Sequence, residues 1–95
     1  MNAREIIRRP LVTEKSMAGL RDGRYTFEVA LRANKVEIRN AVEEIWSVHV
    51  TGVHTMICHG KERRVGRSVG HRPDWKKATV TLRDGDRIEF FEGLL

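Results

Sequence analysis

The 95-residue sequence, with 40% hydrophobic and 33% charged side chains, fits one small domain over residues 1–95, whose single core leaves little space for a large substrate cavity. The net charge of +5 favours a polyanionic partner, such as nucleic acid or an anionic membrane surface. One cysteine, Cys58, excludes an intrachain disulfide and fits a reducing cytoplasmic setting, and no run approaches the roughly 20 apolar residues of a membrane span or forms the apolar core of a signal peptide.

The N-terminal part of the chain predicts a short apolar segment followed by a helix. Ile6 and Ile7 are adjacent apolar residues, and Pro10 ends their segment. Thr13 is a good N-cap, because its hydroxyl can accept a hydrogen bond from a backbone N–H of the first turn. We therefore expect a helix that begins after Thr13 and runs through Leu20.

Residues 25–31 predict a strand, because every second side chain is apolar. The apolar positions are Tyr25, Phe27, Val29 and Leu31. A turn at Arg21-Asp22-Gly23 precedes the strand. The four apolar side chains are expected to face the core.

The next segment predicts a helix of about three turns. Asn34 is a good N-cap, and Glu37 stands three residues later, where its carboxylate can accept a hydrogen bond from the N–H of the cap residue. An apolar stripe with helical spacing follows, made of Ile38, Ala41, Val42 and Ile45.

Residues 48–58 predict a strand rich in β-branched side chains. Its apolar phase changes across Gly52, which predicts a bulge or bend at this glycine. The apolar residues before the change are Val48 and Val50, and those after it are Val53 and Ile57. Residues 77–82 predict the antiparallel partner strand, in which Ala78, Val80 and Leu82 face the core.

The remaining C-terminal residues predict a turn and a tail. Asp84-Gly85-Asp86 turns the chain into residues 88–91, a terminal strand or docked tail. Together the elements predict the α+β class: an antiparallel sheet of about four strands with helices packed on it, of the split β-α-β type, extended by a long basic hairpin loop.

The positive charge of the sequence gathers in one stretch, residues 59–77. The stretch contains seven basic and two acidic residues, a net charge of +5, whereas the rest of the chain has eleven of each. The basic residues are Lys61, Arg63, Arg64, Arg67, Arg72, Lys76 and Lys77. Because the stretch has neither helical nor strand periodicity and contains three glycines, we expect a long, flexible, cationic loop.

The composition of this stretch favours binding to nucleic acid. The planar fork of arginine suits bidentate contacts to phosphate and stacking on bases, and glycine lets the backbone approach a phosphate closely. The alternative is a surface loop whose charges only keep it solvated.

The sequence predicts neither a catalytic nor a metal site, and hence no enzyme and no cofactor. Cys58 with His54, His59 and His71 would form a zinc site with one cysteine, whereas structural zinc sites usually have two or more. The glycines of residues 60–70 are not followed by the Gly-Lys-Ser/Thr and helix of a nucleotide-binding loop.

Four motifs resemble one protein family over nearly the whole chain. They are Arg-Pro-Leu-Val-Thr-Glu-Lys-Ser at residues 9–16, Ala-Asn-Lys-Val-Glu-Ile at residues 33–38, Gly-Lys-Glu-Arg-Arg-Val-Gly-Arg at residues 60–67, and Gly-His-Arg-Pro-Asp-Trp-Lys-Lys-Ala at residues 70–78. In this order they are similar to the bacterial family of protein twenty-three of the large ribosomal subunit. The sequence has Glu62 and His71 where that family often has lysine or arginine.

The resemblance implies a three-layer α+β domain and a ribosomal protein of the cytoplasm that binds domain III of the large-subunit rRNA near the polypeptide exit tunnel. Its implied partners are this rRNA, neighbouring ribosomal proteins, trigger factor and the signal recognition particle; neither membrane insertion nor a homo-oligomer is expected. For Glu14 the resemblance implies chaperone docking. A carboxylate in the first turn of a helix is also favoured by the helix dipole alone.

The residues expected to contact rRNA combine phosphate-binding cations with one aromatic side chain. They are Lys15, Lys35, Lys61, Arg63, Arg64, Arg67, Arg72, Trp75, Lys76 and Lys77. Trp75 suits stacking on a splayed base or sugar, or else packing as an anchor at the base of the hairpin.

Two rival functions belong to other classes. A free-standing RNA-binding regulatory domain would read single strands with aromatic side chains on its sheet, but Tyr25 and Phe27 share the face predicted to form the core. A small phosphate-processing enzyme would need an anion cradle that leads into a helix, whereas this glycine-containing stretch leads into a strand.

Overall fold

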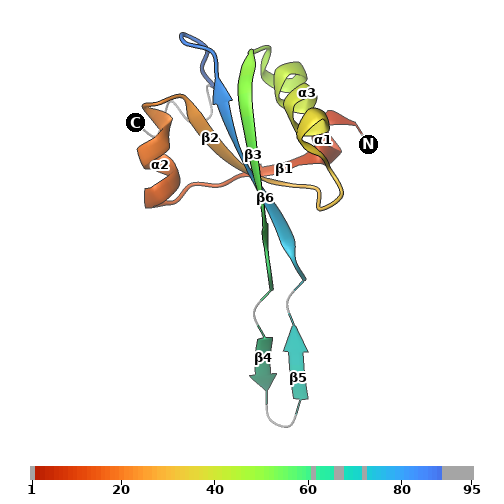
Figure 1. The fold of residues 1–95 in the computed structure, drawn as a ribbon. Helices are drawn as coiled ribbons and strands as arrows, with labels where there is room; N and C mark the ends of the chain where they lie inside the picture. Colours follow the sequence, from red (N-terminus) through yellow and green to blue (C-terminus); the bar gives the residue numbers. More distant parts are fainter. Residues whose placement is uncertain (1, 61, 66–67, 72, 89–95) are drawn as a thin grey trace.

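The computed structural model describes residues 2–60, 62–65, 68–71 and 73–88 (Figure 1). The elements follow the chain in the order α1 (Ala3–Ile6), β1 (Ile7–Pro10), α2 (Glu14–Leu20), β2 (Arg24–Val29), α3 (Lys35–Trp46), β3 (Val50–Cys58), β4 (Glu62–Val65), β5 (Ser68–His71) and β6 (Trp75–Leu82). In this part of the chain, four strands form the main sheet, and β4 and β5 form a separate two-stranded ribbon, called the arm below.

The main sheet has the strand order β1-β2-β6-β3, and each strand is antiparallel to its neighbours. β2 and β3 are therefore parallel to each other, with α3 as their connection and β6 inserted between them. This is the split β-α-β arrangement, and the predicted α+β class is confirmed.

The main core lies between the sheet and the helices α1 and α3 (Figure 1). Alternate residues of β2 and β6 meet the inward stripe of α3, and the buried side chains of these three elements include Tyr25, Phe27, Val29, Ala78, Val80, Leu82, Ile38, Ala41 and Val42. The ring of Trp46 stacks on Phe27 with the ring centroids 5.2 Å apart. These buried positions are those that the apolar patterns predict.

Two large apolar residues of the predicted strands are exposed, and one of them, Leu31, was predicted to face the core. β2 ends at Val29 and the chain then turns, so Leu31 is 48% exposed. Ile57 is 51% exposed, because β3 continues toward the arm beyond the part of the sheet that α3 covers (Figure 1). In both cases the strand pattern extends past the element that buries it.

The helix α2 lies on the other side of the sheet from α1 and α3 (Figure 1). Its inner residues line a groove together with Thr26 and Thr79, which belong to the sheet face opposite the core. The domain thus has the three layers that the family resemblance implies.

Side-chain hydrogen bonds fix where α2 and α3 begin. Asn34 Oδ1 accepts a hydrogen bond from the N–H of Glu37 at 2.8 Å, and Glu37 Oε1 accepts one from the N–H of Asn34 at 3.2 Å. Thr13 Oγ1 accepts from the N–H of Ser16 at 3.1 Å, and Ser16 Oγ accepts from the N–H of Thr13 at 2.7 Å. Both predicted N-caps are confirmed.

The bulge predicted in β3 is also confirmed. Val50 pairs with Leu82 and Gly52 pairs with Thr81, so β3 has one residue more than β6 at this point. The extra residue is Thr51, and its hydroxyl donates a hydrogen bond to the carbonyl oxygen of Thr81 at 3.1 Å. The bulge therefore explains the change of apolar phase across Gly52.

The connection between β3 and β6 contains two strands that the residue pattern did not predict. β4 and β5 pair antiparallel, from Glu62 opposite His71 to Val65 opposite Ser68. The two main strands leave the sheet as antiparallel neighbours, so a second ladder can form further out. The arm makes the molecule elongated, with a radius of gyration of 15.0 Å against about 12 Å for a compact domain of this length.

The C-terminal turn agrees with the prediction, and the tail is described only in part. Gly85 has φ +90°, a conformation that glycine adopts without strain, in the turn that Asp84-Gly85-Asp86 predicts. Ile88 is fully buried in the core, and residues 89–91 of the predicted tail lie outside the described residues. Within the described ranges, no helix is long and apolar enough to cross a membrane.

Candidate nucleic-acid interface

The structure divides the predicted rRNA-binding residues among three places, and the arm is the first. Arg63 and Arg64 belong to β4, opposite Gly70 and Val69 of β5. The arm stands beyond the ends of β3 and β6 and points away from the sheet (Figure 1). Three other predicted cations of residues 59–77 lie outside the described residues: Lys61, Arg67 and Arg72.

Asp74 fastens the base of the arm. Its Oδ1 accepts a hydrogen bond from the N–H of Gly60 at 2.9 Å, and its Oδ2 lies 3.2 Å from Nδ1 of His59. These bonds join the end of β3 to the start of β6, next to the last pair of their ladder, Cys58 and Trp75. Asp74, one of the two acidic residues of the basic stretch, therefore has a structural role that the sequence did not predict.

The second place is the side of the sheet that α3 covers. Lys76 Nζ donates a hydrogen bond to the carbonyl oxygen of Ala33 at 2.5 Å, and the side chain is only partly exposed. Lys35 is exposed in the first turn of α3. Lys76 therefore connects β6 to the start of α3, which gives it a structural contact in addition to its charge.

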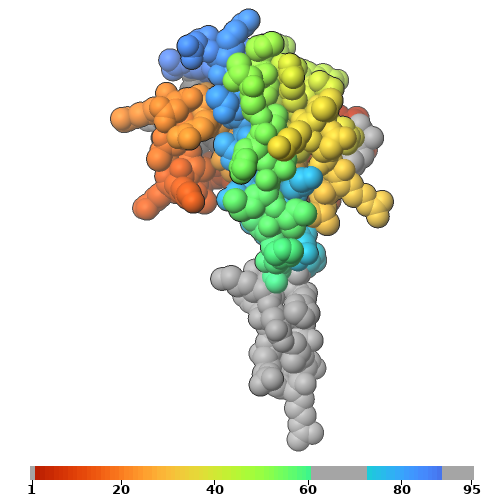
Figure 2. Space-filling model, in the orientation of Figure 1, coloured from red at the N-terminus to blue at the C-terminus, as the bar shows by residue number. Residues whose placement is uncertain are grey.

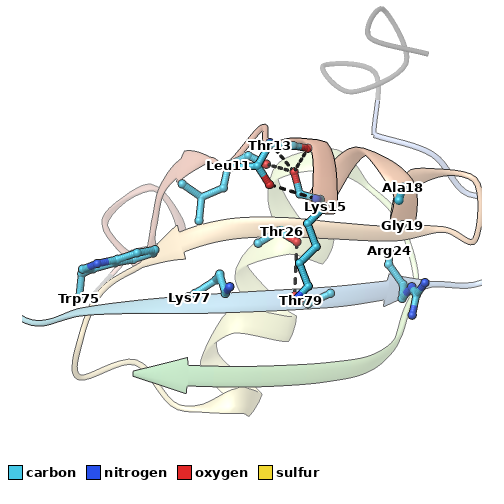
Figure 3. A pocket seen from close by; sticks show the side chains of 11 residues that line it. Leu11, Thr13, Lys15, Ala18, Gly19, Arg24, Thr26, Trp75, Lys77 and Thr79 are labelled. Carbon is cyan, nitrogen blue, oxygen red and sulfur yellow. Dashed lines mark hydrogen bonds between the residues drawn. The ribbon is translucent and has the colours of Figure 1, made fainter. Parts of the chain in front are cut away.

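The third place is a groove between α2 and the opposite face of the sheet (Figure 3). The groove has a volume of about 490 Å³ and contains Lys15 from α2 and both Trp75 and Lys77 from β6. Arg24, at the start of β2, adds a third cation. Three of the predicted contact residues, which are far apart in the sequence, thus lie in one site.

The alternation of β6 separates the adjacent residues Lys76 and Lys77. Successive side chains of a strand point to opposite faces, so Trp75 and Lys77 face the groove while Lys76 faces the α3 side. The basic pair is therefore not one phosphate clamp, as its adjacency in the sequence suggests, but belongs to two surfaces.

Glu14 is exposed at the first position of α2, directly after the N-cap Thr13. It does not line the groove. Val12, two residues before it, is a large apolar residue that is 44% exposed. The carboxylate is therefore on the outer surface, two residues along the chain from an exposed apolar side chain.

Two polar residues of β2 that complete the groove were not among the predicted contact residues. Arg24 and Thr26 lie in the groove because they alternate with the buried Tyr25 and Phe27. The same period-two pattern that predicted the core face could have identified them as the residues of the other face. It could not have shown that α2 packs over that face.

Asp86, in the turn after β6, has a clearly shifted pKa. The N–H of His49 donates a hydrogen bond to Asp86 Oδ2 at 2.7 Å, and Arg83 donates one to Oδ1 at 3.2 Å. The bond from His49, assisted by the bond and charge of Arg83, lowers the pKa of Asp86 below its ordinary value of 3.8, although burial opposes the shift.

Potential metal ligands do not gather in the structure. Across residues 2–60, 62–65, 68–71 and 73–88, no group of three histidine, cysteine or acidic side chains is arranged to hold a metal ion. His59 contacts Asp74, and Cys58 is a partly buried free thiol.

Comparison with known proteins identifies the family. Residues 5–90 match the family described as ribosomal protein L23. The large ribosomal subunit protein uL23 of Roseiflexus castenholzii is 58% identical over 93 residues, which cover 98% of this chain and 99% of the relative. The uL23 proteins of Symbiobacterium thermophilum (54% over 94 residues, 99% and 100% covered) and Anaeromyxobacter sp. strain K (50% over 90 residues, 94% and 93% covered) are similar throughout. The chain therefore belongs to the ribosomal protein L23 family, as its four motifs indicated.

Proposed function

We propose that this chain binds domain III of the large-subunit rRNA near the polypeptide exit tunnel, with the arm as its principal RNA contact. As a ribosomal protein it is a structural constituent of the large subunit and not an enzyme, and its partners are rRNA and other ribosomal proteins. The proposal concerns which rRNA domain it binds and which residues make the contact.

The observation that carries the proposal is the position of the charge. The net charge of residues 59–77 equals that of the whole chain, +5, and the arm lies within this stretch. The body of the molecule narrows along β3 and β6 toward the arm (Figure 2). A narrow cationic ribbon can enter a space between RNA helices, where phosphates surround it on several sides.

The body of the molecule can hold the arm in a fixed orientation. Phosphate contacts fix orientation only if the cations are held by a rigid support. The Asp74 bonds to His59 and Gly60 and the long ladder between β3 and β6 supply that support at the base of the arm.

We further propose that Glu14 is a docking contact for trigger factor and the signal recognition particle. Its carboxylate is exposed, and Val12, two residues before it, is an exposed apolar residue; charge and apolar surface together suit a transient protein interface. Glu14 is on α2, whereas the arm consists of β4 and β5, so the two proposed contacts belong to different elements (Figure 1).

Neutralising the arm tests the rRNA proposal. We expect the full chain with Arg63→Ala, Arg64→Ala and Arg67→Ala to bind a domain III transcript at least about tenfold more weakly in a filter-binding assay, because each arginine lost removes a phosphate contact. The control is Arg4→Ala, Arg21→Ala and Arg39→Ala, which removes the same charge from exposed positions outside the stretch. An equal loss of affinity in both triple variants would show that the effect depends only on net charge, and would contradict the role of the arm.

A further inference from the structure

We infer that the groove between α2 and β6 binds one unstacked nucleotide of the rRNA, with its base on Trp75 and its phosphate between Lys15 and Lys77. This inference rests on the proposed rRNA binding and adds a second, separate contact to it. The arm would bind the sugar-phosphate chain of the RNA, whereas the groove would hold a single base that has left its stack.

The shape of the groove follows from how α2 is held on the sheet. A Cβ atom added at Gly19 would lie 3.3 Å from Cβ of Arg24, so the C-terminal end of α2 approaches β2 closely. Ahead of the helix, the N–H of Leu11 donates a hydrogen bond to the carbonyl oxygen of Thr26 at 2.9 Å. The space between these two attachments has a floor of small side chains, and its volume of about 490 Å³ falls in the range of small-ligand sites.

The charges of the groove favour an anion. Its lining residues include Lys15, Arg24 and Lys77 and no carboxylate. Arg24 is in an ion pair with Asp22 at 3.1 Å, whereas among the described residues neither lysine is within 4.0 Å of a carboxylate oxygen. Both lysines are therefore available for a phosphate between them.

A nearby carboxylate does not cancel this charge. Glu28 is the register partner of Lys77 across β2 and β6 and lies on the same face of the sheet. Its Oε1 is 3.2 Å from Arg9, which holds it in an ion pair toward β1. Among the described residues, no carboxylate forms an ion pair with the Lys77 ammonium group.

Trp75 gives the groove the surface that a base requires. Of the aromatic side chains in the described ranges, Tyr25 and Phe27 are buried in the core, and Trp46 stacks on Phe27 on the α3 side. Trp75 lies at one end of the groove, next to Lys77 (Figure 3). An aromatic side chain and cationic side chains in one groove are the combination that proteins use to bind a splayed base and its phosphate.

The floor of the groove offers polar partners for such a nucleotide. The hydroxyls of Thr26 and Thr79 lie 3.4 Å apart between the Trp75 end and the Arg24 end (Figure 3). Each hydroxyl can donate or accept, so the pair can bind a base edge or a ribose hydroxyl. An acidic peptide could use the lysines but would not explain the position of the indole.

Tryptophan fluorescence can test the groove directly. In the full-length Trp46→Phe variant, Trp75 is the only tryptophan of the chain. We expect a domain III transcript to quench its fluorescence, with the same dissociation constant that filter binding gives, because a base stacks on the indole. If the transcript binds and the fluorescence does not change, the groove contact is wrong and the proposed rRNA binding stands. If wild-type chain does not bind the transcript, the proposed function itself fails.

Substitutions distinguish stacking from simple packing of Trp75. We expect Trp75→Leu to weaken binding about 5- to 150-fold and Trp75→Phe to retain most of the affinity, because leucine packs but cannot stack. Lys15→Ala and Lys77→Ala should each weaken binding more than the control Arg39→Ala, which removes an exposed cation from α3 on the other side of the sheet. Equal affinities for the leucine and phenylalanine variants would show that Trp75 only anchors the arm and would overturn the inference.

Discussion

A single side chain, Asp86, holds together two segments that are far apart in the sequence. It accepts hydrogen bonds from His49, at the start of β3, and from Arg83, at the end of β6. The N–H of Arg83 in turn donates to the carbonyl oxygen of His49 at 2.8 Å. The end of the sheet opposite the arm is therefore closed by one carboxylate, and its ionisation should influence stability.

The pH dependence of this contact has a definite sign. The pKa of Asp86 is lower in the folded chain than its ordinary value of 3.8, so ionised Asp86 stabilises the fold above that value and the effect is lost as the pH falls through the lowered pKa. We expect Asp86→Asn to lower the free energy of unfolding by a constant amount above about pH 5, and by a shrinking amount below pH 4.

Urea unfolding from pH 7 to pH 2.5, monitored by circular dichroism, measures this difference. The control is Asp84→Asn, which removes an exposed carboxylate from the same turn. A difference between wild type and Asp86→Asn that stays constant down to the lowest pH would contradict the assigned linkage.

For Glu14, a purely structural role and a docking role predict different effects of the same substitution on trigger factor binding. A carboxylate at the start of α2 interacts favourably with the helix dipole, so Glu14→Lys should cost about 0.3–1 kcal/mol of stability in either case. If Glu14 is a docking contact, the same change should weaken trigger factor binding to ribosomes at least about tenfold, because the charge at the interface is reversed.

Co-sedimentation of trigger factor with ribosomes that carry the variant chain provides the measurement. Glu44→Lys, an equal charge reversal on the exposed side of α3, serves as the matched control. Unchanged trigger factor binding with Glu14→Lys would leave only the helix-dipole role.

At the scale of elements, the arm depends on how its base is fastened. β3 and β6 form the longest ladder of the sheet, and Asp74 closes its outer end through Gly60 and His59. A charge-assisted hydrogen bond from a backbone N–H is stronger than a neutral one, so the Gly60 amide should be well protected against exchange.

Asp74→Ala tests this attachment. We expect the Gly60 amide to exchange with solvent about ten- to a hundredfold faster in hydrogen-exchange NMR, as the loss of one charge-assisted bond implies. His59→Ala is the control, because it removes only the ring contact and leaves the carboxylate as acceptor for Gly60. The same exchange rate in wild type and Asp74→Ala would show that the base of the arm is held by other contacts.

The elements that the sequence predicted well are those that local signals determine. The caps at Thr13 and Asn34 involve residues three positions apart, and the core faces of β2 and β6 follow from a period of two. The strands of the arm escaped prediction because they lack apolar alternation, and their pairing depends on where β3 and β6 leave the sheet.

The candidate site was predictable in its charge but not in its arrangement. The basic stretch is visible in the sequence, whereas the meeting of Lys15 with Lys77 requires α2 to pack on the sheet face opposite the core. The alternation of side chains along β6 could have predicted that Lys76 and Lys77 point to opposite faces of the sheet. The contact of Lys76 with Ala33, in contrast, depends on the position of α3. Contacts between elements are set by tertiary packing, which residue patterns do not encode locally.

At the scale of the whole molecule, the positive charge is concentrated in residues 59–77, the stretch that contains the arm and the start of β6. Residues outside 59–77 have eleven basic and eleven acidic side chains, so long-range attraction to RNA comes from the stretch that contains the arm. Within this stretch, Arg63 and Arg64 belong to β4, which stands beyond the main sheet (Figure 1). Binding should then respond to salt as a small number of phosphate contacts does.

The salt dependence of rRNA binding can therefore be predicted from the stretch alone. If about five phosphates are neutralised, the logarithm of the association constant should fall with the logarithm of the salt concentration at a slope of about −3 to −5. Filter binding of the full chain to the domain III transcript between 50 and 300 mM salt gives this slope. The variant with Arg63, Arg64 and Arg67 changed to alanine should show a slope smaller by about 3, because each lost contact retains one counterion. A flat response in the wild type would mean that apolar contacts of the body, and not phosphate contacts of the arm, hold the RNA.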